Sequence, residues 1–219
     1  MALTHGEAPA PPPVTHSADD ADLGPRAART REAILDAARK LFLERGYAGT
    51  RINNITDACG ISRAGFYTYF KDKHDVVDVL GRNTYADCLK VIGEWDTMAR
   101  PTTYEDIRAW VKLYFDFMDE HGAFMYALTQ SGPRDEEFRA TALRLQLRVW
   151  FLLGGSLRGR QKAPTHAPEA LGMTTLAMIE QSWSHLRVRR FPVAERDVID
   201  MMATSILRML TSPAHPNER

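Results

Sequence analysis

The sequence predicts an all-α protein with a small N-terminal helical domain and a larger C-terminal helical domain. Apolar residues recur at helical spacing from residue 30 onward, few runs alternate with the period of two that is typical of strands, and glycine and proline separate the helical segments. The chain has 219 residues, 44% of them hydrophobic, which is enough to bury a core. We therefore expect a folded, entirely helical protein.

The same signals divide the chain into four segments. Residues 1–27 are expected to be a disordered tail because they are rich in proline and lack apolar periodicity. We expect a three-helix domain over 28–75, a larger helical domain over 76–212 and a flexible tail over 213–219. From residue 74 onward, glycine and proline residues such as Gly122 and the Gly132-Pro133 pair break the helical pattern. These breaks predict helices over 74–97, 104–121, 123–130, 134–160, 168–188 and 194–211.

Composition argues against several classes of protein. No apolar run approaches the roughly 20 residues of a membrane span, and the N-terminus does not read as a secretory signal. Cys59 and Cys88 are too few for a disulfide framework, and the histidines show no metal-ligand spacing, so we expect neither metal nor cofactor. No phosphate-binding loop, G-x-S-x-G motif or paired acid and base is visible, so we expect no catalytic residues. A cytoplasmic protein with reduced thiols and no membrane partner is the expectation.

Charged side chains are unevenly distributed, although 28 basic residues balance 28 acidic ones. The first 25 residues contain Glu7, Asp19, Asp20 and Asp22 and no lysine or arginine, which gives −4. Residues 26–75 contain 10 basic and 6 acidic side chains, which gives +4, and the remainder is neutral. A basic segment of this length is typical of a nucleic-acid-binding module, although charge alone is equally compatible with a solvated helical surface.

The basic segment begins with one amphipathic helix. Thr30 is the expected N-cap and Gly46 the expected stop. One apolar stripe, at i, i+1, i+4, i+7 and i+8, consists of Ile34, Leu35, Ala38, Leu41 and Phe42.

Residues 50–75 have the pattern of a helix-turn-helix. Thr50 is the expected cap of a short helix that buries Ile52, Ile55 and Cys59. Gly60 breaks this helix, and Ser62 caps the next one, which buries Phe66 and Phe70. Such a unit places its second helix in the major groove of DNA. A helical hairpin without DNA binding is the alternative.

With Phe66 and Phe70 buried, the residues on the exposed face of the second helix suit contacts with DNA. Arg63 can contact guanine O6 and N7 together, and the small Ala64 and Gly65 permit close approach. The hydroxyls of Tyr67 and Tyr69 and the ammonium groups of Lys71 and Lys73 suit phosphate oxygens. The backbone amides at the capped starts of both short helices offer further phosphate sites.

The run from Thr30 to Val79 resembles the DNA-binding domain of the TetR (tetracycline-repressor) family of transcriptional regulators. The residues that carry the resemblance are Leu41-Phe42-Leu43-Glu44-Arg45-Gly46-Tyr47, Gly60-Ile61-Ser62-Arg63-Ala64-Gly65-Phe66-Tyr67-Thr68-Tyr69-Phe70 and Lys73. The resemblance implies base or near-base contacts from Asn53, Arg63, Ala64 and Tyr67, and phosphate contacts from Thr50, Arg51, Gly65, Tyr69 and Lys73. Three positions depart from the family pattern: Thr56 and Cys59 replace a common alanine, and Gly65 replaces a common threonine.

The resemblance also implies that the C-terminal domain binds a small molecule and forms a homodimer through its last two helices. Aromatic and apolar residues on the predicted helices form a candidate pocket for an apolar or aromatic effector. Its candidate members are Trp110, Tyr114, Phe117, Gln146, Trp150, Met178, Gln181 and Trp183, and Glu180 is a further polar candidate. A plain bundle core is the alternative for each of these residues.

Together these inferences predict a ligand-responsive regulator that binds a palindromic operator in double-stranded DNA. We expect a repressor that releases its operator when the effector binds, although the same module also serves activators. The alternative is a ligand carrier or interaction protein of the same fold that does not bind DNA.

Overall fold

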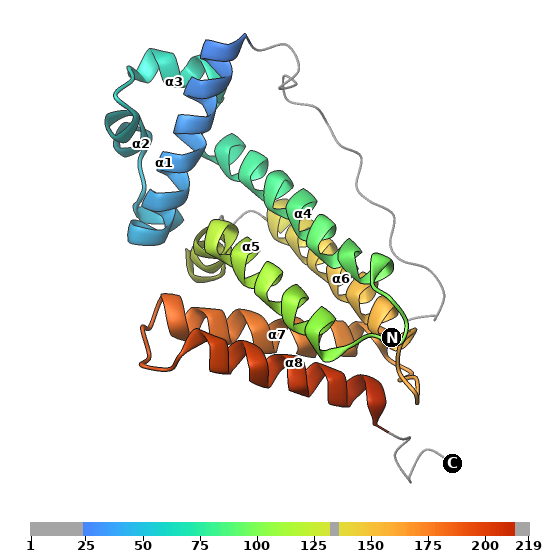
Figure 1. The fold of residues 1–219 in the computed structure, drawn as a ribbon. Coiled ribbons are helices and arrows are strands. Elements are labelled where there is room, and N and C mark those ends of the chain that lie inside the picture. The colour runs from blue at the N-terminus through green and yellow to red at the C-terminus, as the bar shows by residue number, and fades with distance from the viewer. Residues whose placement is uncertain (1–23, 132–135, 213–219) are drawn as a thin grey trace. The chain divides into compact units, whose positions relative to one another are not determined.

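The computed structural model describes residues 24–131 and 136–212, and every regular element in this part is a helix (Figure 1). The helices are α1 Pro25–Gly49, α2 Ile52–Cys59, α3 Arg63–Tyr69, α4 Lys73–Thr97, α5 Tyr104–Ser131, α6 Glu136–Arg158, α7 Pro168–Arg187 and α8 Glu195–Thr211. The all-α prediction is confirmed. Within the described residues, no helix is long and apolar enough to cross a membrane.

The described residues form two compact units. The N-terminal unit contains residues 24–86, 121–131 and 136–141, and the C-terminal unit contains residues 87–120 and 142–212. Three helices, α4, α5 and α6, therefore contribute residues to both units. The sequence predicted only the chain from 28 to 75 as the small domain, so the contribution of α5 and α6 to the N-terminal unit was not anticipated.

The core of the N-terminal unit joins the first three helices to α4 and to the end of α5. The apolar stripe predicted for the first helix is buried, as are Ile55, Phe66 and Phe70. Phe124 of α5 is 2% exposed in the same cluster. Phe138 of α6 packs against the cluster and sets its ring edge-on to His74, with the ring centroids 5.5 Å apart. These aromatic residues extend the small domain beyond its own helices.

Helix α1 begins earlier than predicted. Its N-cap is Gly24 and Pro25 occupies the first turn, so the expected cap at Thr30 is wrong. Proline suits this position because the first backbone N–H groups of a helix have no intrahelical acceptor. The Thr30 hydroxyl instead donates to the carbonyl of Arg26, 3.1 Å away, inside the helix. Gly46 leaves the helical conformation at φ 69°, ψ 167°, which confirms the predicted break there.

The expected cap of α2 is also wrong, because Arg51 and not Thr50 is its N-cap residue. The backbone N–H of Arg51 donates to the side-chain oxygen of Asn54 at 2.9 Å. The Thr50 hydroxyl lies 2.8 Å from the carbonyl oxygen of Gly46 and 3.1 Å from that of Leu41. Through these hydrogen bonds, the Thr50 side chain stabilises the C-terminal end of α1.

Helix α5 runs through Gly122, where a break was predicted between two helices. A glycine inside a helix costs about 1 kcal/mol relative to alanine. Gly122 is buried, so packing of the continuous helix outweighs that local preference. The Gly132-Pro133 break, most of the expected tail 1–27 and the tail 213–219 lie outside the described residues.

The C-terminal unit contains the apolar faces of α5, α7 and α8. Helices α7 and α8 run side by side in Figure 1 and bury Leu176, Ile179, Met202 and Ile206. The side chain of Trp183 in α7 donates from Nε1 to Asp119 of α5 at 2.7 Å. This hydrogen bond links α7 to α5, and α7 packs against α8.

Candidate functional sites

The turn between α2 and α3 has the geometry that the sequence predicts. Gly60 has φ 67° and ψ 32°, the left-handed conformation that favours glycine at the end of a helix. Ser62 is the N-cap of α3, and its Oγ accepts a hydrogen bond from the Gly65 backbone N–H at 3.0 Å. Phe66 and Phe70 are 0% and 2% exposed. This burial fixes which face of α3 remains outside.

Three side chains form a hydrogen-bonded cluster on that outer face. The Arg63 guanidinium donates to the side-chain oxygen of Asn53 at 3.3 Å and to the Tyr67 hydroxyl at 3.1 Å. Its Cζ also lies 5.7 Å from the centre of the Tyr67 ring. Asn53 and Arg63 are exposed, and Tyr67 is 46% exposed. The cluster therefore presents an ordered guanidinium at the surface, near the start of α3.

The small residues of α3 flank this cluster. Ala64 is exposed, Gly65 is half-buried and the Thr68 hydroxyl donates to the Ala64 carbonyl at 3.3 Å. A methyl group at Gly65 would lie 3.4 Å from the Ser62 Oγ and would project toward no other group closer than 3.8 Å. At Ala64 and Gly65, the first turn of α3 thus has no bulky side chain that would keep a ligand away from its backbone.

Two of the residues predicted to contact phosphate, Thr50 and Lys73, have structural roles in the fold. Thr50 is 1% exposed, so its hydroxyl is not available at the surface. The Lys73 ammonium donates to the carbonyl oxygens of Tyr47 at 2.5 Å and Thr50 at 2.7 Å, and it lies 4.0 Å from the Tyr47 ring centre. Burial lowers the pKa of Lys73. Thr50 and Lys73 join the end of α1, the start of α2 and the start of α4, whereas Arg51 is exposed.

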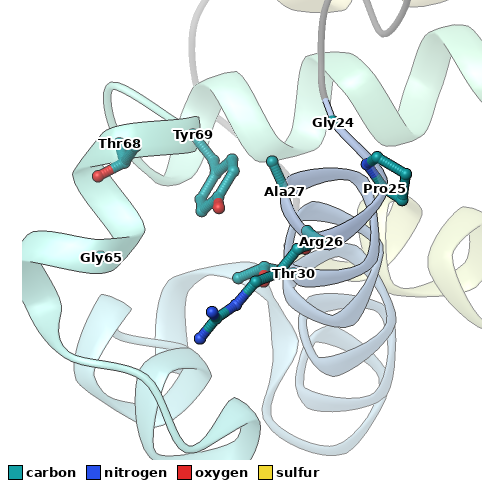
Figure 2. Close-up of a pocket in the computed structure, with 8 residues that line it drawn as sticks. All are labelled: Gly24, Pro25, Arg26, Ala27, Thr30, Gly65, Thr68 and Tyr69. Atoms are coloured by element: carbon teal, nitrogen blue, oxygen red, sulfur yellow. The ribbon is translucent and has the colours of Figure 1, made fainter.

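A groove of about 520 Å³ lies between the start of α1 and α3 (Figure 2). The Arg26 side chain from α1 and the Tyr69 ring from α3 project into this space. Its lining residues are Gly24, Pro25, Arg26, Ala27, Thr30, Gly65, Thr68 and Tyr69. The sequence singled out Gly65 and Tyr69 but missed Arg26, because the helix was expected to begin at Thr30. Pro25 was the signal for the earlier start.

In the C-terminal unit, three predicted effector contacts form a buried aromatic row on α5. Trp110, Tyr114 and Phe117 are 2%, 0% and 6% exposed, and their successive ring centroids are 5.7 and 5.3 Å apart. Trp95 of α4, which the sequence did not single out, extends the row at 5.2 Å from Trp110. The Trp110 indole donates to the Val91 carbonyl at 2.8 Å, so its polar atom is already paired within the fold.

A buried polar pair lies beside this row. The Tyr114 hydroxyl donates to a carboxylate oxygen of Glu180 in α7 at 2.8 Å, and Cys88 is hydrogen-bonded to the same hydroxyl. Burial raises the pKa of Glu180, and it raises that of Tyr114 well above its usual value. Desolvation also raises the pKa of the Cys88 thiol to about 12. Glu180 is therefore a carboxyl group without a described cationic partner in an apolar setting.

The other predicted effector residues lie in different surroundings. Gln146 and Gln181 are exposed, and Gln181 forms a 3.0 Å hydrogen bond with His185. Both amides therefore lie on exposed faces of their helices and not beside the buried aromatic row, and their contact with an effector stays a prediction. Trp150 and Met178 are half-buried, and Trp183 is 5% exposed.

Residues 34–80 match the family of bacterial regulatory proteins called the tetR family. This segment of the chain is therefore similar to the DNA-binding part of TetR-family regulators. The matched TetR segment contains the whole of α2 and α3, the outer cluster of Asn53, Arg63 and Tyr67, and the residues that join α1 to α4.

Two helix-turn-helix transcriptional repressors illustrate the similarity in sequence to known regulators. The chain is 32% identical over 71 residues to the transcriptional repressor AcnR of Corynebacterium glutamicum, a match that covers 32% of this chain and 38% of the relative. It is 44% identical over 57 residues to the transcriptional repressor BepR of Brucella suis, covering 26% of this chain and 27% of the relative. The chain thus spans well under half of the length of these relatives.

Solved TetR structures share the fold over most of the chain. The regulator PfmR of Thermus thermophilus has a TM-score of 0.64 at 22% identity, covering 81% of this chain and 98% of its own. A TetR-family regulator from Rhodococcus sp. has a TM-score of 0.64 at 17% identity, covering 83% and 99%. At this identity the likeness shows the all-α TetR fold.

Proposed function

We propose that the protein is a DNA-binding transcriptional regulator that represses transcription until a small molecule binds its C-terminal unit. The observation that carries the proposal is the exposed cluster of Asn53, Arg63 and Tyr67 at the start of a capped helix in a TetR-type helix-turn-helix. The names of AcnR and BepR as repressors support the direction of regulation.

In this proposal, α3 enters the major groove and its first residues contact base edges. Arg63 contacts guanine O6 and N7, and its bonds to Asn53 and Tyr67 hold the guanidinium in place before DNA arrives. Arg51 and the groove between α1 and α3 contact phosphates, with Arg26 and Tyr69 as donors. The net positive charge of residues 26–75 supports these contacts with phosphates.

A dimer would present two such helices to two half-sites about 34–36 Å apart in a palindrome. The last two helices carry exposed apolar side chains that a second copy would cover: Met173 on α7 is 39% exposed and Met201 on α8 is 65% exposed. Their opposite faces are buried within the chain. We therefore assign the dimer contact to α7 and α8.

The effector in this proposal is a largely apolar or aromatic compound that contacts the aromatic row of Trp110, Tyr114 and Phe117. Binding shifts the population toward a conformation in which α4, which contributes to both units, holds the two recognition helices at the wrong spacing. A near-complete switch requires about 10⁴-fold tighter binding to the released conformation.

The test is fluorescence anisotropy of the full chain with labelled DNA from upstream of its own coding region, beside a scrambled duplex, at two salt concentrations. A regulator binds the native fragment more tightly and saturates at an even number of chains per site. If affinity for both duplexes is absent at low salt and native mass spectrometry shows no retained ligand, the carrier alternative replaces the regulator.

Substitution of Arg63 separates base contact from general attraction. Arg63→Ala is expected to cost about 1–3 kcal/mol at one base position and to relax specificity there. Arg63→Lys keeps the charge but loses the forked geometry, so it recovers nonspecific affinity without specificity. Arg196→Ala is the control, because the Arg196 side chain is 79% exposed and pairs only with its neighbour Asp197 among the described contacts.

A further inference from the structure

The sequence before α1 has the opposite charge to the helices that follow it. Residues 1–23 contain four acidic side chains, Glu7, Asp19, Asp20 and Asp22, and no lysine or arginine. This segment lies outside the described residues, and it joins the structure at Gly24. Gly24 itself lines the groove between α1 and α3. The acidic segment therefore enters the described fold at the edge of the proposed DNA-binding surface.

The groove has the features of a site for negatively charged groups. Arg26 lines it, and Arg29 is exposed on the next turn of the same helix. The first turn of α1 has no acidic residue and no side-chain cap, so its partial positive charge is not compensated by the described residues. The Tyr69 hydroxyl adds a donor, whereas the Thr30 and Thr68 hydroxyls already donate to helix carbonyls. Together, the Arg26 guanidinium, the start of α1 and the Tyr69 hydroxyl suit carboxylates as well as phosphates.

We propose that the acidic segment 1–23 binds this groove when DNA is absent and competes there with the DNA backbone. The inference rests on the proposed function, since it needs the groove to contact phosphate. Asp19, Asp20 and Asp22 are the carboxylates nearest to the groove along the chain, and they act as intramolecular substitutes for phosphate.

The length of the connection permits this contact. An extended chain spans at most about 3.3–3.6 Å per residue, so Asp22 lies within about 7 Å of Gly24 and Asp19 within about 18 Å. A short tether gives a segment an effective concentration on the order of millimolar. Contacts that are individually weak, each worth up to about 1 kcal/mol at an exposed site, are then sufficient to occupy the groove part of the time.

Competition between the acidic segment and DNA for the groove changes both the affinity for DNA and the salt dependence of that affinity. DNA must displace the carboxylates before phosphates reach Arg26, so the segment weakens binding most at low salt, where charge interactions are least screened. Its neutralisation is expected to tighten DNA binding about three- to tenfold near 50 mM salt, and much less near 200 mM. The plot of affinity against salt becomes steeper, because DNA then binds a groove that holds no carboxylates.

The experiment compares the full chain with a full-length variant that carries Glu7→Gln, Asp19→Asn, Asp20→Asn and Asp22→Asn. Anisotropy with the native and scrambled duplexes is measured at both salt concentrations. A second variant, with alanine at Pro9, Pro11, Pro12 and Pro13, keeps the charge and controls for composition. This control is expected to bind DNA as the unsubstituted chain does.

A double-mutant cycle locates the contact. If the carboxylates bind at Arg26, their neutralisation tightens DNA binding in the unsubstituted chain but has little effect when Arg26→Ala is present. Arg45→Ala is the matched control, because Arg45 is exposed on the same helix, about 29 Å away at 1.5 Å per residue. In the Arg45→Ala background, neutralisation of the carboxylates is expected to give the full increase in DNA affinity.

The outcomes separate this inference from the proposed function. Equal DNA affinity with and without the four carboxylates overturns the competition and leaves the regulator intact. Weaker binding after neutralisation also overturns it, because the segment would then assist DNA binding. A gain that persists fully in the Arg26→Ala background shows general repulsion of DNA and refutes the groove as its site. Absence of DNA binding by every variant counts against the proposed function itself.

Discussion

Gly154 of α6 and Gly172 of α7 bring the backbones of these two helices into direct contact. A methyl group built on Gly154 would lie 1.7 Å from the Pro168 carbonyl oxygen, and one built on Gly172 would lie 1.9 Å from that of Trp150. No side chain fits at either position unless the helices separate. The α6–α7 crossing in the C-terminal unit therefore depends on two glycines that are 18 residues apart in the sequence.

Gly154→Ala is expected to destabilise the protein by about 2 kcal/mol or more, because overpacking here involves backbone atoms that cannot move aside. Thermal unfolding followed by circular dichroism measures the effect. Gly155→Ala is the matched control: its methyl group meets nothing within 4 Å, so higher helix propensity should raise stability by up to about 1 kcal/mol. Equal unfolding temperatures for the two variants would refute the close crossing.

Thr50 and Arg51 are adjacent, but their substitutions should have different effects. Thr50→Val removes a buried hydroxyl that bonds to α1 carbonyls, which should lower the free energy of unfolding by about 1–2 kcal/mol. Arg51→Ala should leave stability unchanged and reduce the slope of log affinity for DNA against log salt by about 1. Denaturant unfolding and DNA titration of both variants provide the test. A DNA defect confined to Thr50→Val would contradict the assignment.

Phe124 is expected to be essential for the N-terminal unit although it lies far along the chain from the recognition helix. It is 2% exposed in the core that contains Phe66 and Phe70. Phe124→Ala should destabilise this core by about 3–5 kcal/mol. Hydrogen exchange should then show faster opening of α1 and α3 than in the unsubstituted protein. Unchanged exchange in those helices would show that α5 does not support them.

Glu180 should make stability depend on pH. Because burial raises its pKa in the folded protein, the folded state holds this proton more strongly than the unfolded state does. Stability is then lost as pH rises from the ordinary pKa of glutamate, about 4.3, through the raised value, and it levels off above that value. Glu180→Gln keeps an acceptor for the Tyr114 hydroxyl and cannot ionise. The variant should exceed the unsubstituted chain in stability at pH 7 and match it near pH 4.

Urea unfolding at several pH values measures this difference. Gln181→Glu is a useful control, because Gln181 is exposed on the neighbouring position of α7 and a carboxylate there remains solvated. It should leave the pH profile nearly unchanged. A constant stability difference between Glu180→Gln and the unsubstituted chain at all pH values would show that Glu180 does not titrate in this range.

The helix-turn-helix could be predicted from the sequence because its signals are local. The cap at Ser62, the left-handed turn at Gly60 and the i, i+4 spacing of Phe66 and Phe70 all fall within eleven residues. Such patterns depend on backbone conformation and helical period, which neighbouring residues set. The same reasoning placed Arg63 and Tyr67 on the outer face.

Contacts between distant residues could not be predicted in this way. The sequence predicted that Thr50 and Lys73 contact phosphates. In the fold, their side chains donate hydrogen bonds to backbone carbonyls of α1 and of the loop that follows it. The sequence named both Glu180 and Gln181 as polar candidates, but only the fold shows that Glu180 reaches Tyr114, 66 residues away, while Gln181 is exposed. A one-residue change on a helix rotates a side chain by about 100°, so periodicity alone does not fix which polar residue faces inward.

The helical class, the helix-turn-helix and the exposed face of α3 can thus be predicted from the sequence, because each follows from short-range spacing and capping. The contacts between side chains of different helices become visible only in the folded chain. The joining of Phe124 to the first core, the pairing of Glu180 with Tyr114 and the contact of α6 with α7 at Gly154 all depend on how separate helices pack. Packing requires complementary surfaces from distant parts of the chain, and local preference does not specify them.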